Sequence, residues 1–344
     1  MSQNDNIKAG YHKETSIQLV EYVRISLGTA MKLGLESGPF LENFTTAFLM
    51  TYHDGGCTAN CSFCPQASSS ESNPELLSRI GWPQFKLDEI AEKLAQNKDF
   101  KRVCIQSLNY PGVVEDVIQL VLAAKRAVGA RVSVCIHPVS TLDMIRLRDA
   151  GVDNMGIAID ACTPSLFDKV KGNERNSRYT WEGHIAAIKE AQTIFGKDNV
   201  TTHLIVGMGE SEDEIVKFLF DMQDLAVRVG LFAFTPVEGT NFEKIPQPDL
   251  GRYRRVQILR NLMTRGKVSK EEVFIDALGK IAFAKDEKEL RTLLSSGVAF
   301  QVSGCPGCNR PYYNERPRGP MYNYPRQLSE EECEQALSES GLVK

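Results

Sequence analysis

Short apolar segments alternate with longer amphipathic segments through most of this chain. The apolar segments are rich in β-branched residues and are predicted as buried strands, whereas the longer segments repeat apolar positions at helical spacing. The predicted strands cover residues 44–52, 102–108, 131–137, 154–160, 200–206 and 231–234. The predicted helices between them cover residues 87–96, 114–128, 141–150, 180–195 and 211–226.

This alternation predicts an α/β fold with a parallel sheet. Strands that are joined through helices pair in parallel with right-handed crossovers, which leaves the helices outside the sheet. Six such strands fit a partial (β/α)6 barrel better than a closed barrel of eight units. In barrels of this kind, the functional residues lie at the carboxyl ends of the strands.

The pattern changes toward both ends, which predicts three regions. Residues 1–43 are expected to form an N-terminal helical preface, because apolar positions between residues 13 and 36 recur at helical spacing. Residues 44–240 form the predicted partial barrel, and residues 241–344 form a C-terminal extension.

Within the extension, three segments differ in character. Residues 250–265 predict a basic helix with a solvated charged face, and residues 273–283 predict a hairpin. Residues 304–325 are dense in Pro, Gly, Tyr and Arg and cannot form a regular helix or a central strand. This tail must be held by specific contacts or by a metal.

Composition narrows the class of partner. The net charge is −4 and no basic stripe is present, so a nucleic-acid partner is not expected. No apolar run of about 18 residues suggests a membrane span, and the first ten residues are polar, so we expect a cytoplasmic protein with no membrane partner. Nine cysteines form no disulfide pattern of a small domain, and in a reducing compartment clustered thiols are more often metal ligands.

Three of these cysteines, Cys57, Cys61 and Cys64, lie in the loop after the first predicted strand. Local zinc sites usually reach four ligands, but the count in this loop stops at three. Three thiolates on a four-iron cluster leave one iron open for a cofactor or a substrate. The alternative of three loop thiols without a metal conflicts with the usual position of free cysteines, which are buried and inert.

The C-x3-C-x2-C spacing, with Phe63 before the last cysteine and six strand–helix units, resembles the radical S-adenosylmethionine superfamily over roughly residues 44–240. Within that superfamily the chain is similar to the biotin synthase group. The segments Met50-Thr51-Tyr52-His53 and Cys64-Pro65-Gln66-Ala67, together with the tail from Cys305 to Tyr324, resemble the archaeal-type two-protein lipoyl synthases. The resemblance implies a 4Fe-4S cluster on Cys57, Cys61 and Cys64 that binds S-adenosylmethionine.

The resemblance also implies which residues contact that cofactor. Phe63 and Ile205 would lie against its adenine, and Gly207 would let the backbone approach closely. Asp160 would bind the ribose hydroxyls, and Arg178 would meet the methionine carboxylate, for which a guanidinium fork is suited.

Two positions depart from the biotin synthase pattern. Gln106 is the candidate contact to the methionine amine, but many relatives carry two glycines and a glutamate in this region. Cys104 and Cys135 occupy the places of two ligands of a sacrificial cluster inside the barrel, whereas Thr201 stands where the third cysteine is found. Lone strand cysteines are otherwise core residues more often than ligands.

The tail offers two further thiolates, Cys305 and Cys308, in a Pro- and Gly-containing C-x2-C loop. We expect the tail to fold over the barrel mouth, so that Cys305 and Cys308 join Cys104 and Cys135 around an auxiliary 4Fe-4S cluster and act as the catalytic pair. Cys162 and Cys333 are expected to be structural, with Cys333 as the substitute ligand.

By this resemblance, the protein inserts sulfur into the octanoyl chain of a lipoyl carrier protein and forms one of the two C–S bonds. Its implied partners are the octanoylated carrier, a second radical S-adenosylmethionine protein and an electron donor. Alternatives that stay open are a biotin synthase-like or other radical enzyme, and a non-catalytic iron–sulfur or zinc carrier.

Overall fold

The computed structural model describes residues 19–38, 43–315 and 318–343. Its central feature is an eight-stranded sheet in the order β10-β9-β8-β7-β6-β2-β1-β5. The six predicted strands pair in parallel and confirm the partial barrel. Their bounds are β2 (Thr46–Thr51), β6 (Arg102–Gln106), β7 (Arg131–Cys135), β8 (Asn154–Gly156), β9 (Val200–Val206) and β10 (Arg228–Ala233).

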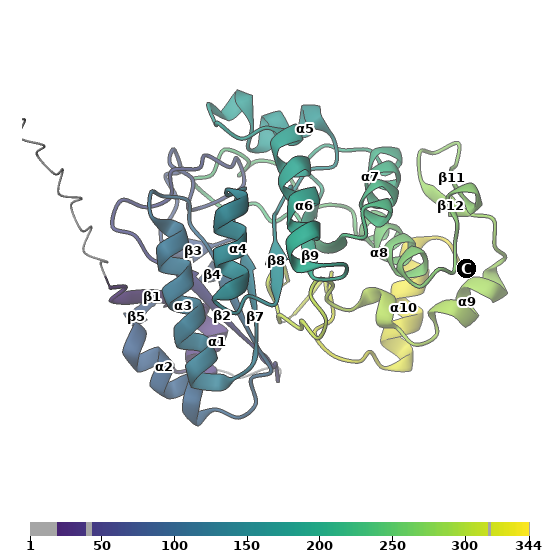
Figure 1. The fold of residues 1–344 in the computed structure, drawn as a ribbon. Coiled ribbons are helices and arrows are strands. Elements are labelled where there is room, and N and C mark those ends of the chain that lie inside the picture. The colour runs from purple at the N-terminus through teal and green to yellow at the C-terminus, as the bar shows by residue number, and fades with distance from the viewer. Residues whose placement is uncertain (1–18, 39–42, 316–317, 344) are drawn as a thin grey trace, which may run out of the picture.

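The predicted helices of the barrel are also present, and they lie along the outer side of the sheet (Figure 1). Side-chain caps fix the beginning of two of them: Thr180 accepts from the backbone N–H of Gly183, and Ser211 forms a capping box with Glu214. A short helix that was not predicted, α5 (Pro164–Val170), begins with Thr163 as cap. The outer helices are α2 (Leu87–Gln96), α3 (Val113–Val128), α4 (Thr141–Asp149), α6 (Trp181–Phe195) and α7 (Glu212–Asp224).

The N-terminal preface is not wholly helical, so this prediction was wrong in part. Residues 13–18 lie outside the described residues, and β1 (Tyr22–Ile25) pairs antiparallel with β2 and with β5 (Gln84–Lys86). Within residues 19–38 of the preface, only α1 (Leu27–Lys32) is helical. The reason is that Val23 and Ile25 alternate with more exposed neighbours and are buried against the sheet, which satisfies the two-residue period of a strand.

A small hairpin of β3 (Leu76–Leu77) and β4 (Ile80–Gly81) joins two distant segments. Gln66, just after the cysteine loop, donates from Nε2 to the carbonyl of Leu76 over 2.6 Å. Arg79 donates from Nη2 to the carbonyl of Tyr312 in the tail over 2.8 Å. The hairpin therefore contacts both cysteine-bearing segments.

The C-terminal extension packs beside α7 at one end of the sheet (Figure 1). The prediction that the charged face of α8 (Leu250–Thr264) is solvated was wrong. Arg254 and Arg255 are buried, and they pair with Glu339 and Glu212, respectively. The other elements are β11 (Val273–Ile275), β12 (Ile281–Phe283), α9 (Glu287–Leu294) and α10 (Glu330–Ser340). The predicted hairpin is β11–β12.

The tail runs along the free edge of β10. The backbone N–H of Leu231 donates to Ser303 Oγ over 2.7 Å, and Arg310 Nη2 donates to the carbonyl of Leu231 over 3.0 Å. The edge strand of the open barrel is thus covered by irregular chain. Among the described residues, no helix is both long and apolar enough to cross a membrane.

Candidate metal and cofactor site

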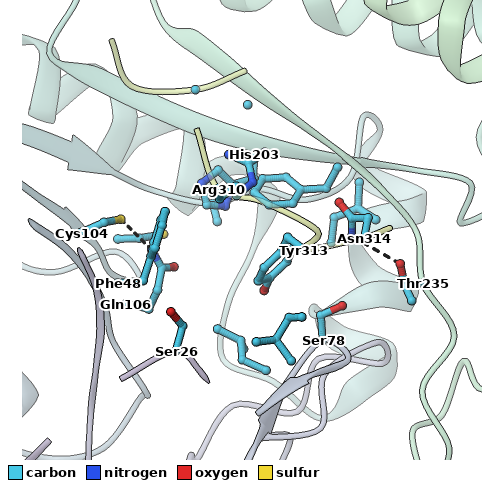
Figure 2. Close-up of a pocket in the computed structure, with 18 of the residues that line it drawn as sticks. Ser26, Phe48, Ser78, Cys104, Gln106, His203, Thr235, Arg310, Tyr313 and Asn314 are labelled. Atoms are coloured by element: carbon cyan, nitrogen blue, oxygen red, sulfur yellow. Dashed lines mark hydrogen bonds between the residues drawn. The ribbon is translucent and has the colours of Figure 1, made fainter. Parts of the chain in front are cut away.

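The inner face of the sheet, the β3–β4 hairpin and the tail enclose a cavity of about 560 Å³ (Figure 2). This volume suits a small-molecule ligand. Six of the nine cysteines line the cavity: Cys61, Cys64, Cys104, Cys135, Cys305 and Cys308.

The first thiol set comprises Cys57, Cys61 and Cys64. Cys57 Sγ accepts the backbone N–H of Asn109 over 3.2 Å, and the backbone N–H of Cys64 donates to the carbonyl of Cys61 over 3.1 Å. Burial raises the pKa of the Cys61 thiol to about 11, and the pKa of Cys64 rises further because of burial and the neighbouring Cys61. The loop after β2 thus gathers three half-buried cysteines, as the sequence predicts.

The second thiol set comprises Cys104 on β6, Cys135 on β7, and Cys305 and Cys308 in the tail. Ser133 Oγ donates to Cys305 Sγ over 3.4 Å, and the backbone N–H of Cys308 donates to the carbonyl of Cys305 over 3.0 Å. The pKa of the Cys104 thiol is raised well above its usual range by burial and then by the other three thiols. The structure therefore brings together all four predicted ligands of the second cluster.

The tail cysteines do not lie over the barrel mouth, so their predicted position was wrong. Arg102 Nη2 donates to the carbonyl of Pro306 over 3.2 Å, and the backbone N–H of Thr45 donates to Asn309 Oδ1 over 3.2 Å. Arg102 and Thr45 stand at the amino ends of β6 and β2, whereas the cysteine loop follows the carboxyl end of β2. The tail cysteines and the cysteine loop consequently approach the cavity from opposite ends of the sheet, and Cys104 and Cys135 lie on the strands between them.

Cys333 is not needed as a substitute ligand. It is buried on α10 and donates from Sγ to the carbonyl of Leu294 over 3.5 Å. Cys162 is also buried and does not line the cavity. Neither cysteine lines the cavity, and the structural role of both stays a prediction.

A buried ion pair lies between the two thiol sets. Lys171 Nζ is 2.5 Å from Asp160 Oδ2 and donates to the carbonyl of Ala158 over 2.7 Å. Burial alone would lower the pKa of Lys171, but Asp160 and the thiols of Cys61 and Cys135 outweigh it, so the pKa is raised. Asp160, the predicted ribose contact, thus has a cationic partner in the protein.

The other predicted cofactor residues divide into two groups. Phe63, Gln106 and Ile205 line the cavity, and Gln106 Nε2 donates to Cys104 Sγ over 3.1 Å. Arg178 is exposed, lies over the ring of Tyr179 and faces a separate hollow. Their contacts with the cofactor stay predictions.

Gly207 also lies outside the cavity lining. Its φ is +109°, and an added Cβ would come within 2.8 Å of Pro248 Cδ. The close approach that requires glycine here is an approach of the chain to Pro248.

Sequence reasoning missed several polar residues of the cavity wall, among them Lys171, His203, Arg310 and Tyr313. Arg310 lies 3.9 Å over the ring of Phe232 and 3.7 Å from Cys308 Sγ. Burial lowers the pKa of His203 to about 4. The density of Arg and Tyr beside the tail cysteines was the available signal for Arg310 and Tyr313.

The donor chemistry fits two iron–sulfur clusters. Buried thiolates are unfavourable unless a cation compensates them, and a metal centre supplies that charge. The loop offers three thiolates, which leaves one iron open, whereas the second set offers the four that close a 4Fe-4S cluster. Within the described ranges, no three His, Cys, Asp or Glu side chains converge on a site for a single metal ion. A four-iron cluster bonds each cysteine to a different iron, so its ligands need not converge.

A six-stranded parallel partial barrel with three cysteines in the loop after its first strand defines the class of this protein. The family model described as the radical SAM superfamily matches residues 51–222, which is half of the chain. The chain therefore belongs to the radical S-adenosylmethionine superfamily, whose cofactors are a 4Fe-4S cluster and S-adenosylmethionine.

Within the superfamily the chain is similar to biotin synthases. It is 22% identical over 200 residues to the biotin synthase of Acetivibrio thermocellus, a match that covers 56% of this chain and 58% of that protein. It is 27% identical over 263 residues to the biotin synthase of Saccharopolyspora erythraea, a match that covers 74% of this chain and 67% of that protein. The first of these matches spans less than two thirds of the relative's length.

Two solved structures share the fold. Methylornithine synthase (PylB) has a TM-score of 0.50 and 20% identity, covering 65% of this chain and 63% of that chain. The FeFe-hydrogenase maturase HydG from Carboxydothermus hydrogenoformans has a TM-score of 0.51 and 15% identity. This match covers 87% of this chain and 67% of that chain. At these identities the likeness concerns the fold alone.

Proposed function

We propose that this protein is a radical S-adenosylmethionine enzyme that inserts sulfur into the octanoyl chain of a lipoyl carrier protein. It forms one of the two C–S bonds of the lipoyl group, and a second radical S-adenosylmethionine protein forms the other. An electron donor completes the set of partners.

One observation carries the proposal: two thiol sets border a single cavity, the set of three through Cys61 and Cys64 and the set of four through all of its members. The first suits a cluster with an open iron, and the second suits a closed cluster whose sulfide is the available sulfur. The chemistry supplied by the bound cofactors is reductive cleavage of S-adenosylmethionine, removal of a hydrogen atom from an aliphatic carbon and transfer of sulfur to that carbon.

The cavity wall supports an aliphatic substrate. Near β1, α1 and the hairpin the wall is apolar, which favours burial of a hydrocarbon chain. The residues there are Leu27, Met31, Phe44, Phe48, Leu77, Ile80 and Trp82.

The chain's own residues have three tasks in this proposal. Lys171 provides a buried cation between two anionic clusters, which limits their mutual repulsion. The β3–β4 hairpin and Tyr312 cover one side of the cavity, so they would limit the access of water to a carbon radical. The apolar wall orients the substrate carbon toward the second thiol set.

A biotin synthase-like reaction is the second candidate, because the curated relatives described above carry that name. Cys104 and Cys135 fit it, but Thr201 on β9 supplies no third strand thiolate. The two candidates differ in their substrate, since one requires a long acyl chain and the other a compact ring.

The test is anaerobic incubation of the reconstituted protein with S-adenosylmethionine, a reductant and either an octanoyl-lysyl peptide or dethiobiotin. Mass spectrometry is expected to find a thiolated octanoyl peptide. Thiolated dethiobiotin in its place would favour the second candidate. If 5′-deoxyadenosine does not form in either incubation, the protein is a carrier and not an enzyme.

A further inference from the structure

Asn314, in the wall of the cavity, carries a buried amide oxygen that has no hydrogen-bond partner among the described residues. The residue follows Tyr313 in the tail, lines the cavity and is only 6% exposed. Its Oδ1 is buried and accepts no hydrogen bond from the described residues. A buried acceptor of this kind is unfavourable unless a ligand supplies a donor.

The hydrogen bonds of the neighbouring residue fix the orientation of this amide. Thr235 Oγ1 donates its proton to the carbonyl of Ala233 over 3.3 Å, so it accepts from Asn314 Nδ2, which lies 3.3 Å away. Figure 2 shows this second bond at the edge of the cavity. Gln247 Nε2 supports the pair with bonds of 3.4 Å to Thr235 Oγ1 and to the Asn314 carbonyl. Oδ1 therefore stays available to an N–H donor.

The position of Asn314 suits the far end of a long substrate. In Figure 2, Asn314 and Thr235 lie on one side of the cavity, whereas Cys104 and Gln106 lie on the opposite side, with Tyr313 between them. A chain whose reacting carbon lies near the second thiol set would extend across the cavity, and its head group would reach Asn314.

We propose that Asn314 Oδ1 accepts a hydrogen bond from the N–H of the amide that joins the acyl chain to its carrier lysine. This inference rests on the proposed function and adds a residue that sets specificity: the site would select acyl amides over acyl esters, which lack that N–H. The adenine amino group of S-adenosylmethionine is the other source of the same donor chemistry, and the experiment separates the two.

The experiment uses the full chain with both clusters reconstituted, without S-adenosylmethionine. Two matched peptides are titrated, one with Nε-octanoyl-lysine and one in which an ester oxygen replaces the amide N–H. Wild type is expected to bind the amide roughly tenfold more tightly than the ester. For Asn314→Leu, the dissociation constants of the amide and ester peptides should agree within about twofold. Gln247→Leu is the matched control. It removes the hydrogen bonds of Gln247 to Thr235 and Asn314 but changes no residue of the cavity lining, so this variant should keep the preference for the amide peptide.

Equal affinity of wild type for amide and ester would overturn the inference and leave the proposed function standing. Failure of wild type to bind either peptide would overturn both. If Asn314→Leu weakens binding of S-adenosylmethionine, measured separately, and keeps the amide preference, the partner is the adenine and the inference is wrong. Should Asn314→Leu fail to fold, Asn314→Ala removes the same oxygen, and the wild-type comparison needs no variant.

Discussion

Ser133 on β7 donates a hydrogen bond to the thiol of Cys305 in the tail over 3.4 Å, although the two residues are 172 positions apart. The contact fixes the tail beside Cys104 and Cys135 and so completes a set of four thiols. A covering segment at the amino ends of the strands thereby becomes part of the wall that a substrate would meet.

Replacing Cys305 and Cys308 together with alanine should separate cofactor cleavage from sulfur transfer. The first thiol set is untouched, so formation of 5′-deoxyadenosine should be largely retained, while bound iron falls by about half and thiolated product disappears. Iron analysis measures the bound iron, and mass spectrometry of the same preparation measures 5′-deoxyadenosine and the thiolated product.

The strand cysteines and Cys333 provide the matched comparison. Cys104→Ala with Cys135→Ala should reproduce the tail phenotype. In contrast, Cys333→Ala should keep both clusters, because among the described residues Cys333 bonds to backbone groups near α9. Sulfur insertion that survives loss of Cys305 and Cys308 would return the tail to a structural role.

Replacing Cys57, Cys61 and Cys64 with alanine should have the opposite outcome. The second cluster should remain, but formation of 5′-deoxyadenosine should fall to background because the open iron is lost. Product analysis by chromatography tests this, and unchanged cleavage would refute the assignment of the loop.

Lys171→Met should destabilise the protein by about 3–5 kcal/mol, because it leaves the buried carboxylate of Asp160 without its cation. Asp160→Asn combined with Lys171→Met should recover most of that loss, since no uncompensated charge remains. Urea unfolding monitored by circular dichroism measures both variants. Equal stability of Lys171→Met and wild type would contradict a stabilising role of the pair between Lys171 and Asp160.

His184 should make the fold sensitive to acid. Burial lowers its pKa from 6.5 to about 3, so between these values the unfolded chain binds a proton that the folded chain does not. The contribution of the neutral His184 to the free energy of unfolding is therefore complete above pH 6.5 and decreases as the pH falls below that value. His184→Phe should flatten this dependence in denaturant titrations between pH 8 and pH 5, and parallel curves for the two proteins would count against it.

The sequence was sufficient for the barrel because its helices and strands differ strongly in period. Helix α2 was predicted with the observed bounds, Leu87–Gln96, since its apolar positions recur at helical spacing and charged residues fill the other face. The strand β1 was missed because a strand of four residues is too short to show its period beside a helical pattern.

The thiol loop was predictable because its ligands are adjacent in sequence, whereas Lys171 and Asn314 were not. Each becomes part of the site only through partners that the fold brings near, Asp160 in one case and Thr235 in the other. The position of the tail also depended on long-range contacts, such as that of Arg102 with Pro306, which no local pattern encodes.

The most direct test of the central claim follows the sulfur atom. The protein is reconstituted with ³⁴S-sulfide, freed of unbound sulfide, and incubated anaerobically with S-adenosylmethionine, a reductant and an octanoyl-lysyl peptide. We predict that mass spectrometry will find ³⁴S bonded to the octanoyl chain, and that the variant lacking Cys305 and Cys308 will give none. A thiolated peptide that carries sulfur of natural isotopic composition would contradict the account.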